Sequence, residues 1–372
     1  MKETEDPRIK EFAEILLNHS TDIGEGDNVY LLATSLESLP LFREVRRQII
    51  KKGAFPHEHL LYDSQIGSAC LDYDWVKHAS KEQLEKTSEA KLKEMQKMDA
   101  YVRIGGQDNY QELSKVSSDK VSSAVKGGEE IKEERFDIDW ATTRYPTTGL
   151  AQSAGMSSQE LEELVFDAVT VTDWEEQKSK NQRIKQKFDQ GSEVRIVGEN
   201  NDLRFSLEGR EGVNSYGKRN MPDGEVFYAP RKETLEGEIR FTYPGISNGA
   251  WIHDIKLCFE NGEIVEFSAT KNEDQLKSII ETDEGSKFIG EFGIGMNQSL
   301  DMFTGETLLD EKIAGTVHLA IGRAYKKSHP NEEKRNKSAV HWDLIKDLRP
   351  EFGGGKIILD GEVVQEDGEW QF

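Results

Sequence analysis

The stretch Asn28-Val29-Tyr30-Leu31-Leu32-Ala33-Thr34, with the segment from Leu39 to Lys52 that follows it, decides the fold of the first half of the chain. The first segment is a short apolar run bounded by Gly26 and Ser35, which is typical of a buried strand. The second carries apolar residues at helical spacing and ends at Gly53. A buried strand followed by an amphipathic helix is the repeating unit of an α/β sheet.

The same alternation extends along the first half of the chain. Gly105-Gly106 ends one predicted strand, but the segment lacks the glycine spacing of nucleotide-binding loops, so we interpret it as a turn into a short helix. Helix patterns cover residues 7–18, 80–98 and 109–115, and further strand patterns cover residues 58–62, 100–104 and 137–142. This order predicts an N-terminal α/β domain with a mostly parallel sheet.

The pattern of apolar residues changes near residue 190, from helical spacing to alternation. Helix patterns before this point cover residues 157–171, which open with the capping sequence Ser157-Ser158-Gln159-Glu160, and residues 174–189. Beyond it the strand patterns alternate at period two, which indicates antiparallel pairing. They cover residues 193–197, 202–207, 237–243, 252–260 and 263–268, with the turn Asn261-Gly262 joining the last two. We therefore predict an α/β domain over residues 1–190 and an α+β domain over residues 191–372.

The composition indicates a globular, acidic protein. The 372 residues carry a formal net charge of -22 and a pI near 4.9, so the surface is expected to repel nucleic acid and anionic membranes. No apolar run is long enough to span a membrane, and the first residues lack the apolar core of a secretory signal. Cys70 and Cys258 lie far apart and are interpreted as buried thiols, not a disulfide. We expect a cytoplasmic protein.

Two acidic residues stand beside glycines in otherwise apolar settings. Glu225 follows the turn Pro222-Asp223-Gly224 at the start of a predicted strand. Glu291 lies within a predicted glycine-rich apolar strand from Phe288 to Gly295, where a lone buried carboxylate is unfavourable unless a cation or a donor offsets it. The glycines also permit close approach of an ion or a substrate.

Two histidines follow in the sequence. His318 is predicted to lie on a helix, with Glu311 seven residues before it and Tyr325 seven residues after it, which would place all three on one helical face. A single histidine on an apolar helix is also common as a core residue. His341 and Asp343 are two residues apart in a predicted strand, so both side chains would point the same way and could ligate one ion.

Together these acids and imidazoles suit a divalent-metal site. Five or six oxygen and nitrogen ligands fit two zinc or cobalt ions that share a bridging carboxylate. The two cysteines, Cys70 and Cys258, do not stand beside any of these acids and histidines in the sequence, which argues against a structural zinc site. The candidate ligands are Glu225, Glu291, Glu311, His318, His341 and Asp343.

At these residues the chain resembles the thermophilic metalloaminopeptidase family, which includes aminopeptidases T, S and II. The family pattern Pro-x-Gly-Glu-Val-Phe-x-x-Pro is similar to Pro222 to Pro230, and its Gly-Glu pair is similar to Gly290-Glu291. The pattern His-(Ile/Leu)-Ala-x-Gly-x-Ala-Tyr is matched by His318 to Tyr325, and Asn-x-Ser-x-x-His-x-Asp is matched by Asn336 to Asp343. The matching motifs fall within residues 215 to 345.

The resemblance implies an exopeptidase that removes N-terminal residues with two divalent ions. It makes the six candidates metal ligands and Tyr325 a catalytic side chain. It also implies a homodimer whose active sites face an internal cavity, which favours short peptides. Glu311 stands two residues further from His318 than is usual in the family, so it is the least secure ligand. The stretch from Tyr325 to His341 is shorter than usual in the family and carries a charged loop at residues 326–337.

The expected chemistry is hydrolysis by a metal-activated water. Either Glu225 or Glu291 could accept the proton of the water and pass it to the leaving amine, and the sequence does not separate these two. Tyr325 could donate a hydrogen bond to the oxyanion. Two alternatives stay open: a dinuclear hydrolase acting on a non-peptide amide, and a non-catalytic acidic protein that binds metal or peptide.

Overall fold

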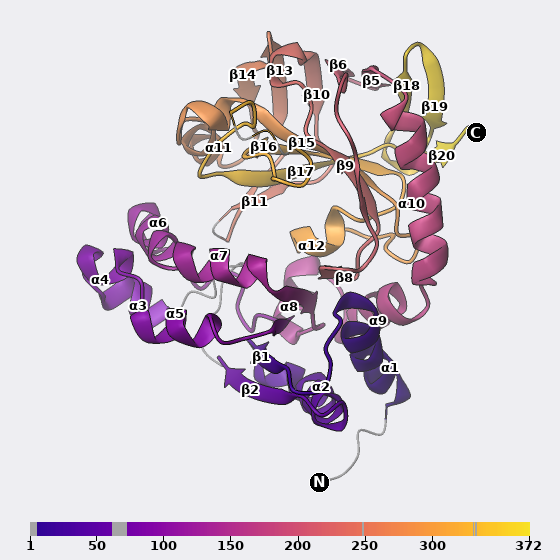
Figure 1. Ribbon diagram of the computed structural model, residues 1–372. Helices are drawn as coiled ribbons and strands as arrows, with labels where there is room; N and C mark the ends of the chain where they lie inside the picture. The colour runs from indigo at the N-terminus through magenta and orange to yellow at the C-terminus, as the bar shows by residue number, and fades with distance from the viewer. Residues whose placement is uncertain (1–5, 62–72, 248, 330, 332) are drawn as a thin grey trace. The chain divides into compact units, whose positions relative to one another are not determined.

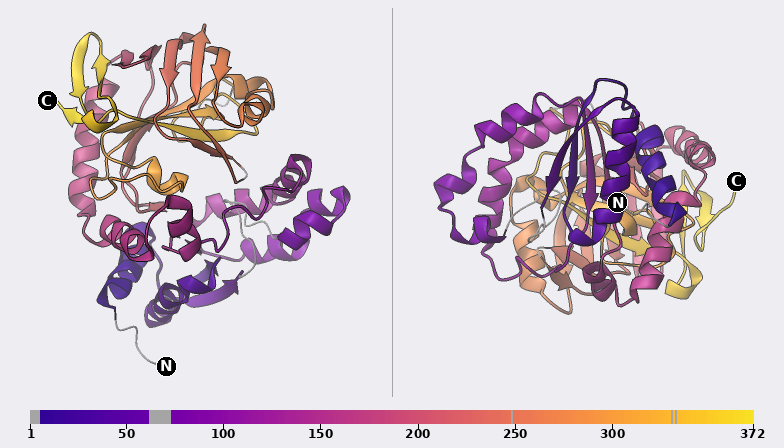
Figure 2. Two further views of the ribbon diagram at one scale, coloured as in Figure 1. Left: turned by 180° about the vertical axis from the view of Figure 1, so that it is seen from behind. Right: turned by 90° about the horizontal axis from the view of Figure 1, so that it is seen from below.

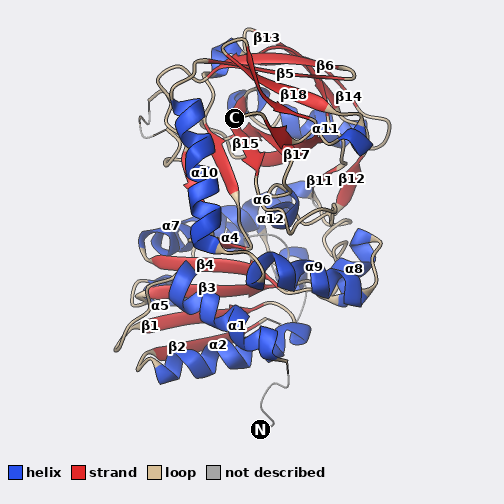
Figure 3. Cartoon of the chain, turned by 90° about the vertical axis from the view of Figure 1, so that its right-hand side faces the viewer, coloured by secondary structure: helices blue, strands red, loops and turns tan. Residues whose placement is uncertain are grey.

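Five parallel strands form the sheet of the N-terminal part of the chain, in the order β2 (Phe55–Leu60), β1 (Asn28–Ala33), β3 (Ala100–Gly105), β4 (Asp139–Arg144) and β8 (Asn220–Met221). Figure 3 shows β1 to β4 side by side. Val29 and Leu31 of β1 are fully buried, and Leu32, on the other face, packs with Tyr101 and Met95. Burial on both faces explains why β1 is a continuous apolar run, as parallel strands usually are. The predicted parallel α/β sheet is confirmed.

The computed structural model describes residues 6–61, 73–247, 249–329, 331 and 333–372 (Figure 1). The chain forms two compact units, the first made of Met1–Thr172 with Gly217–Pro222 and the second of Asp173–Tyr216 with Asp223–Phe372. The predicted domains, residues 1–190 and 191–372, are parts of the chain expected to fold independently, and that expectation stays a prediction. The helices of the first unit are α1 (Pro7–Ile15), which continues into a π-helical turn (Leu16–Ser20), α2 (Leu39–Lys51), α3 (Tyr73–His78), α4 (Lys81–Glu85), α5 (Glu89–Met95), α6 (Ser118–Gly127), α7 (Glu129–Asp137), α8 (Thr148–Ala154) and α9 (Ser158–Thr170).

Two predicted helices of the first unit are wrong. Residues 80–98 form α4 and α5 instead of one helix, because Ser80 and Ser88 each cap a helix of their own with a side-chain oxygen. Residues 109–115 form hydrogen-bonded turns, which begin where the side chain of Asn109 accepts the backbone N–H of Gln111 at 3.0 Å. Residue 62, the end of one predicted strand, lies outside the described residues.

The second unit is built on antiparallel sheets and the helix α10 (Trp174–Asp189). An eight-stranded sheet has the order β14 (Glu263–Ser268), β13 (Lys256–Glu260), β10 (Glu236–Arg240), β6 (Asn201–Ser206), β5 (Glu193–Gly198), β18 (Gly355–Leu359), β19 (Glu362–Glu366) and β20 (Glu369–Trp370). Figure 2 shows the yellow β18–β19 hairpin and the β13–β14 hairpin from behind. A two-stranded ribbon joins β11 (Gly245–Ser247) and β12 (Ala250–Ile252), and α11 (Glu273–Ile280) and α12 (Thr307–Asp310) complete the helices.

The hairpin predicted at Asn261-Gly262 is confirmed, with both residues at positive φ. The single strand predicted over residues 252–260 is wrong, because Asp254 at φ 63 separates β12 from β13. Cys258 is a free, half-buried thiol, and Cys70 lies outside the described residues. Among the residues described, no helix is both long and apolar enough to cross a membrane.

Candidate metal centre

A five-stranded antiparallel sheet of the second unit carries most of the candidate ligands. Its order is β17 (His341–Asp347), β16 (Thr316–Gly322), β15 (Ile289–Gly295), β9 (Glu225–Tyr228) and β7 (Val213–Ser215), and Figure 1 labels β9, β15, β16 and β17. In the register, Gly295 lies opposite Glu225, Gly293 opposite His318, and Ala320 opposite both Glu291 and Asp343. Side chains alternate along a strand, so one face of the sheet carries Glu225, Glu291, His318, His341 and Asp343.

The two faces of this sheet differ sharply in chemistry. The face opposite the acids and histidines is part of the main hydrophobic core of the second unit, with Phe292, Val317 and Leu319 fully buried in it. On the face that carries the acids and histidines, glycine leaves space for the larger side chains. A Cβ atom on Gly293 would lie 2.1 Å from two atoms of the His318 ring, so only glycine leaves room for that imidazole.

The prediction that His318 lies on a helix is wrong. Thr316–Gly322 is the strand β16, and Tyr325 lies in the loop after it, so the helical face expected to join Glu311, His318 and Tyr325 does not exist. The local sequence contains the signal for a strand. Val317, Leu319 and Ile321 alternate with residues of the other face at period two.

The structure nevertheless brings the six candidate ligands together. His318 Nε2 lies 3.5 Å from Glu225 Oε2 and 3.6 Å from Glu291 Oε1. His341 Nε2 lies 3.7 Å from Asp343 Oδ1. In each of three overlapping groups the ligand atoms lie within 4.8 Å of one another, and these groups are Glu225–Glu291–His318, Glu291–His341–Asp343 and Glu311–His318–Asp343.

Two further charged residues of the cluster were missed by the sequence reasoning. Lys312 is fully buried, and its Nζ lies 2.6 Å from Glu225 Oε1 and 2.7 Å from Glu311 Oε1. Asp223, also fully buried, has Oδ1 3.8 Å from the same Nζ. The available signal was a lysine beside a candidate ligand and between the apolar residues Leu309 and Ile313.

The histidine and the tyrosine at the end of the cluster are held by backbone and ring contacts. His341 Nδ1 lies 2.7 Å from the carbonyl oxygen of Arg323, so the ring donates there and leaves Nε2 free as a ligand atom. The rings of Tyr325 and His341 lie 4.3 Å apart between centroids. Tyr325 is 39% exposed as a residue, so it stands at the accessible edge of the cluster.

The donor atoms of the cluster fit a metal ion. Buried polar atoms are normally hydrogen-bonded. Here Glu225 Oε2, Glu291 Oε2, Asp343 Oδ1 and both ring nitrogens of His318 are buried without a hydrogen-bond partner. A divalent cation requires carboxylate oxygens and imidazole nitrogens that lie close together and have no other partner.

The profile of the thermophilic metalloprotease (M29) family matches residues 5–370 of this sequence. The chain belongs to the M29 family. It is 29% identical to aminopeptidase AmpS of Bacillus subtilis over 73% of this chain and 71% of that one. It is 24% identical to aminopeptidase 2 of Geobacillus stearothermophilus, with 98% of each chain covered.

Solved structures show the same fold. The wild-type AmpT of Thermus thermophilus superposes with a TM-score of 0.80 at 22% identity, covering 98% of this chain and 99% of that one. A 2,5-dihydroxypyridine dioxygenase of Pseudomonas putida has a TM-score of 0.60 at 13% identity, covering 98% of this chain and 96% of that one. Because proteins with different named activities share this fold, the fold does not by itself decide the reaction. The side chains of the candidate metal centre must do so.

Burial changes the pKa values of the acids and histidines in this cluster. Loss of hydration raises the pKa of Glu225 and Glu291 to about 8 and the pKa of Asp343 to about 7. Burial acts in the same direction on Glu311 and is the largest single effect, but Lys312, His318 and His341 together outweigh it, so the pKa of Glu311 is lowered. Burial lowers the pKa of His341, which favours the neutral imidazole that metals bind.

The shifted pKa values of Lys312 and Tyr325 keep each of these side chains in one charge state. Burial acts to lower the pKa of Lys312, but Glu225, Glu311 and Asp223 outweigh it and the pKa is raised, so the ammonium stays charged. Desolvation, then the Glu291 and Asp343 charges, raises the pKa of the Tyr325 hydroxyl, which keeps its proton.

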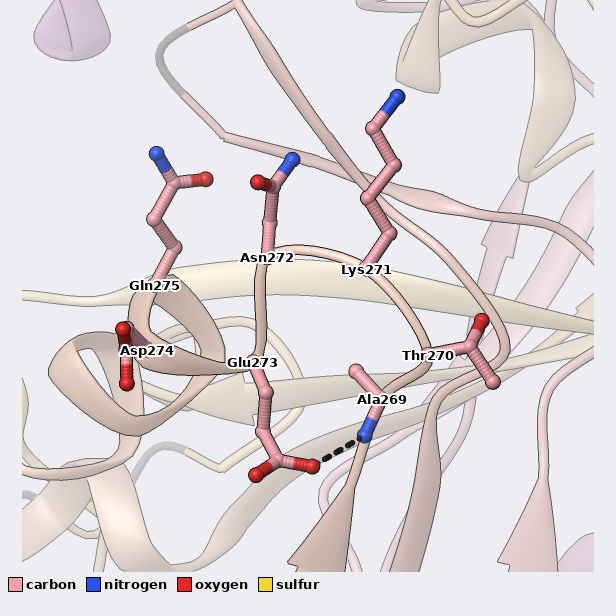
Figure 4. Close-up of a pocket in the computed structure, with 7 residues that line it drawn as sticks. All are labelled: Ala269, Thr270, Lys271, Asn272, Glu273, Asp274 and Gln275. Carbon is pink, nitrogen blue, oxygen red and sulfur yellow. Dashed lines mark hydrogen bonds between the residues drawn. The ribbon is translucent and has the colours of Figure 1, made fainter.

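A separate hollow in the second unit of this M29 protein is lined by residues 269–275 (Figure 4). It is formed by one continuous, mostly exposed segment, in which Glu273 accepts the backbone N–H of Ala269 at 3.0 Å. It shares no residue with the cluster of acids and histidines. Its side chains do not converge as those around Glu291 do.

Proposed function

We propose that this chain is a metal-dependent aminopeptidase that hydrolyses N-terminal residues from short peptides. The single observation that carries the proposal is the convergence of unpaired, buried carboxylate and imidazole atoms on one face of the β9–β15–β16–β17 sheet. Membership of the M29 family and the aminopeptidase names of its relatives support the reaction class. The proposed metal ligands are Glu225, Glu291, Glu311, His318, His341 and Asp343.

We further propose that the site holds two divalent ions, zinc or cobalt. The carboxylates of Asp223, Glu225, Glu291, Glu311 and Asp343 and the Lys312 ammonium would together carry four negative charges when fully ionised. Two divalent cations neutralise four charges, and buried charge is stable only when compensated. The mixture of imidazole and carboxylate donors suits zinc or cobalt better than magnesium or calcium.

Bound divalent ions would supply a water of lowered pKa and would polarise the scissile carbonyl. The protein side chains then move the protons. Glu291 is the proposed proton carrier between the water and the leaving amine, because Glu225 is restrained by Lys312 while Glu291 Oε2 has no partner. Tyr325, whose hydroxyl stays protonated, is placed to donate a hydrogen bond to the oxyanion.

Selection of a free N-terminus follows from the groups that the site offers to the substrate amine. The free α-amine of the substrate would lie against a metal ion or one of the carboxylates, a contact that a blocked N-terminus cannot make. The test compares leucyl p-nitroanilide with its N-acetyl form. Hydrolysis of the free-amine substrate alone supports the proposal. Hydrolysis of the blocked substrate alone would instead identify an amidohydrolase acting on other amides.

We also propose that the protein is a cytoplasmic homodimer. The resemblance to the metalloaminopeptidase family supports the dimer, and the acidic composition suits the cytoplasm. Light scattering coupled to size-exclusion chromatography measures the mass directly. A mass near twice 42.2 kDa supports the dimer, and a mass near 42.2 kDa contradicts it.

A further inference from the structure

Lys312 carries a buried positive charge inside the candidate metal centre. Its side chain is 1% exposed, between the side chains of Glu225 and Glu311. A buried ammonium is unfavourable unless carboxylates surround it closely. Lys312 satisfies that condition with two ion pairs, of 2.6 Å and 2.7 Å, and a third carboxylate at 3.8 Å.

The two short ion pairs leave part of each carboxylate for another partner. Lys312 engages Oε1 of Glu225, while Oε2 of the same residue has no hydrogen-bond partner and lies 3.5 Å from His318 Nε2. Lys312 also engages Oε1 of Glu311, whose group with His318 and Asp343 forms the other side of the cluster. One ammonium therefore fixes the orientation of two carboxylates that come from different parts of the chain.

The backbone around Lys312 is anchored to the turn that carries Glu225. The carbonyl oxygen of Lys312 accepts the N–H of Asn297 at 2.9 Å, and the Asn297 side chain donates to the carbonyl oxygen of Asp223 at 2.8 Å. Met296, the neighbour of Asn297, donates its N–H to Gly224 at 2.8 Å. Asn297 is fully buried, so these contacts form a rigid connection between the two segments that Lys312 also joins through its side chain.

We propose that Lys312 is a positioning residue of this centre: its ammonium holds one oxygen each of Glu225 and Glu311, so that the remaining oxygens converge on the metal ions. This inference rests on the proposed metal-dependent function. A positioning role for Lys312 differs from simple charge compensation. A lysine that only offset negative charge would compete with a metal ion, and its removal would strengthen metal binding. A lysine that positions ligands weakens metal binding when it is removed.

The test compares Lys312→Met with Lys346→Met. Methionine has nearly the length of the lysine side chain without its charge. Lys346 is a second buried lysine of the same unit, on β17, and it makes no ion pair with the candidate ligands in the described part of the chain, so it is the matched control. The metal-stripped proteins are titrated with Co²⁺ by equilibrium dialysis. The visible spectrum of the bound cobalt reports its coordination, and circular dichroism reports the fold.

The wild type and Lys346→Met are expected to bind two Co²⁺ ions with equal affinity. Lys312→Met is expected to lose affinity by about 10- to 100-fold at one ion or both, with a changed cobalt spectrum, as for other residues that orient metal ligands. Unchanged or tighter binding by a folded Lys312→Met variant overturns the inference and leaves the proposed function intact. If the wild type binds no cobalt, the proposed function fails first.

Lys312→Arg decides the question if the methionine variant does not fold. Arginine keeps the charge but presents a planar, longer fork of donors, so the two carboxylates cannot keep their positions. A folded Lys312→Arg variant with weakened cobalt binding supports a positioning role. Wild-type cobalt binding by that variant shows that charge alone matters, and it overturns the inference.

Discussion

Replacement of Gly293 by alanine should disable the metal centre while leaving the fold intact. The added Cβ would lie 2.1 Å from Cε1 and Nε2 of His318, whereas an ordinary contact begins at 3.4 Å. His318 is fully buried between neighbouring strands, so the ring or the strand must shift by roughly one ångström. Overpacking of this kind costs about 1–3 kcal/mol of unfolding free energy, and a ligand displaced that far costs about 100-fold in activity.

The assay measures hydrolysis of leucyl p-nitroanilide, bound metal and urea unfolding for Gly293→Ala. Gly128→Ala is the control, because a Cβ there meets nothing closer than 3.5 Å and the residue has an ordinary helical φ. The control should retain activity and stability. Wild-type activity and metal content in Gly293→Ala would refute the placement of His318 opposite Gly293, and with it the account of the sheet face.

The other predictions concern the acids, the tyrosine and pH. Glu291→Gln and His341→Ala should each abolish hydrolysis of aminoacyl arylamides while circular dichroism stays native, and full activity in either removes that residue from the site. Tyr325→Phe should lower kcat much more than metal content, because the hydroxyl is assigned to the oxyanion, and an unchanged kcat excludes that role. The raised pKa values, about 8 for Glu225 and Glu291 and about 7 for Asp343, mean that the folded metal-free protein holds protons that the unfolded chain releases. The thermal midpoint of metal-free protein should therefore fall as pH rises from about 5 to 8, and bound zinc should suppress this fall; a midpoint independent of pH contradicts the buried cluster.

The sequence predicted the parallel sheet well because its strands are short, apolar and buried on both faces. The run Asn28 to Thr34 is a strand, and the hairpin at Asn261-Gly262 is confirmed because both turn residues need positive φ. The 80–98 helix was wrong because periodicity does not show where a serine caps a new helix. Ser88 could have been read as such a cap, since it precedes a run of good helix formers.

The candidate site was predicted in composition but not in geometry. Glu291 and the His341–Asp343 pair were expected on strands and lie on them. His318 was placed on a helix because alanine, leucine and glycine around it obscured the alternation of Val317, Leu319 and Ile321. Lys312 could not be assigned from the sequence, because its partners come from segments far apart along the chain and only the fold brings them together.

The most direct test of the central claim measures metal content and aminopeptidase activity on one purified sample. Elemental analysis and hydrolysis of leucyl p-nitroanilide are followed while metal is removed by a chelator and returned as zinc or cobalt. The cluster of carboxylates and imidazoles, several of whose buried atoms lack a hydrogen-bond partner, predicts close to two divalent ions per chain, with activity that disappears and returns with them. Full activity in protein shown to contain no metal would contradict the account.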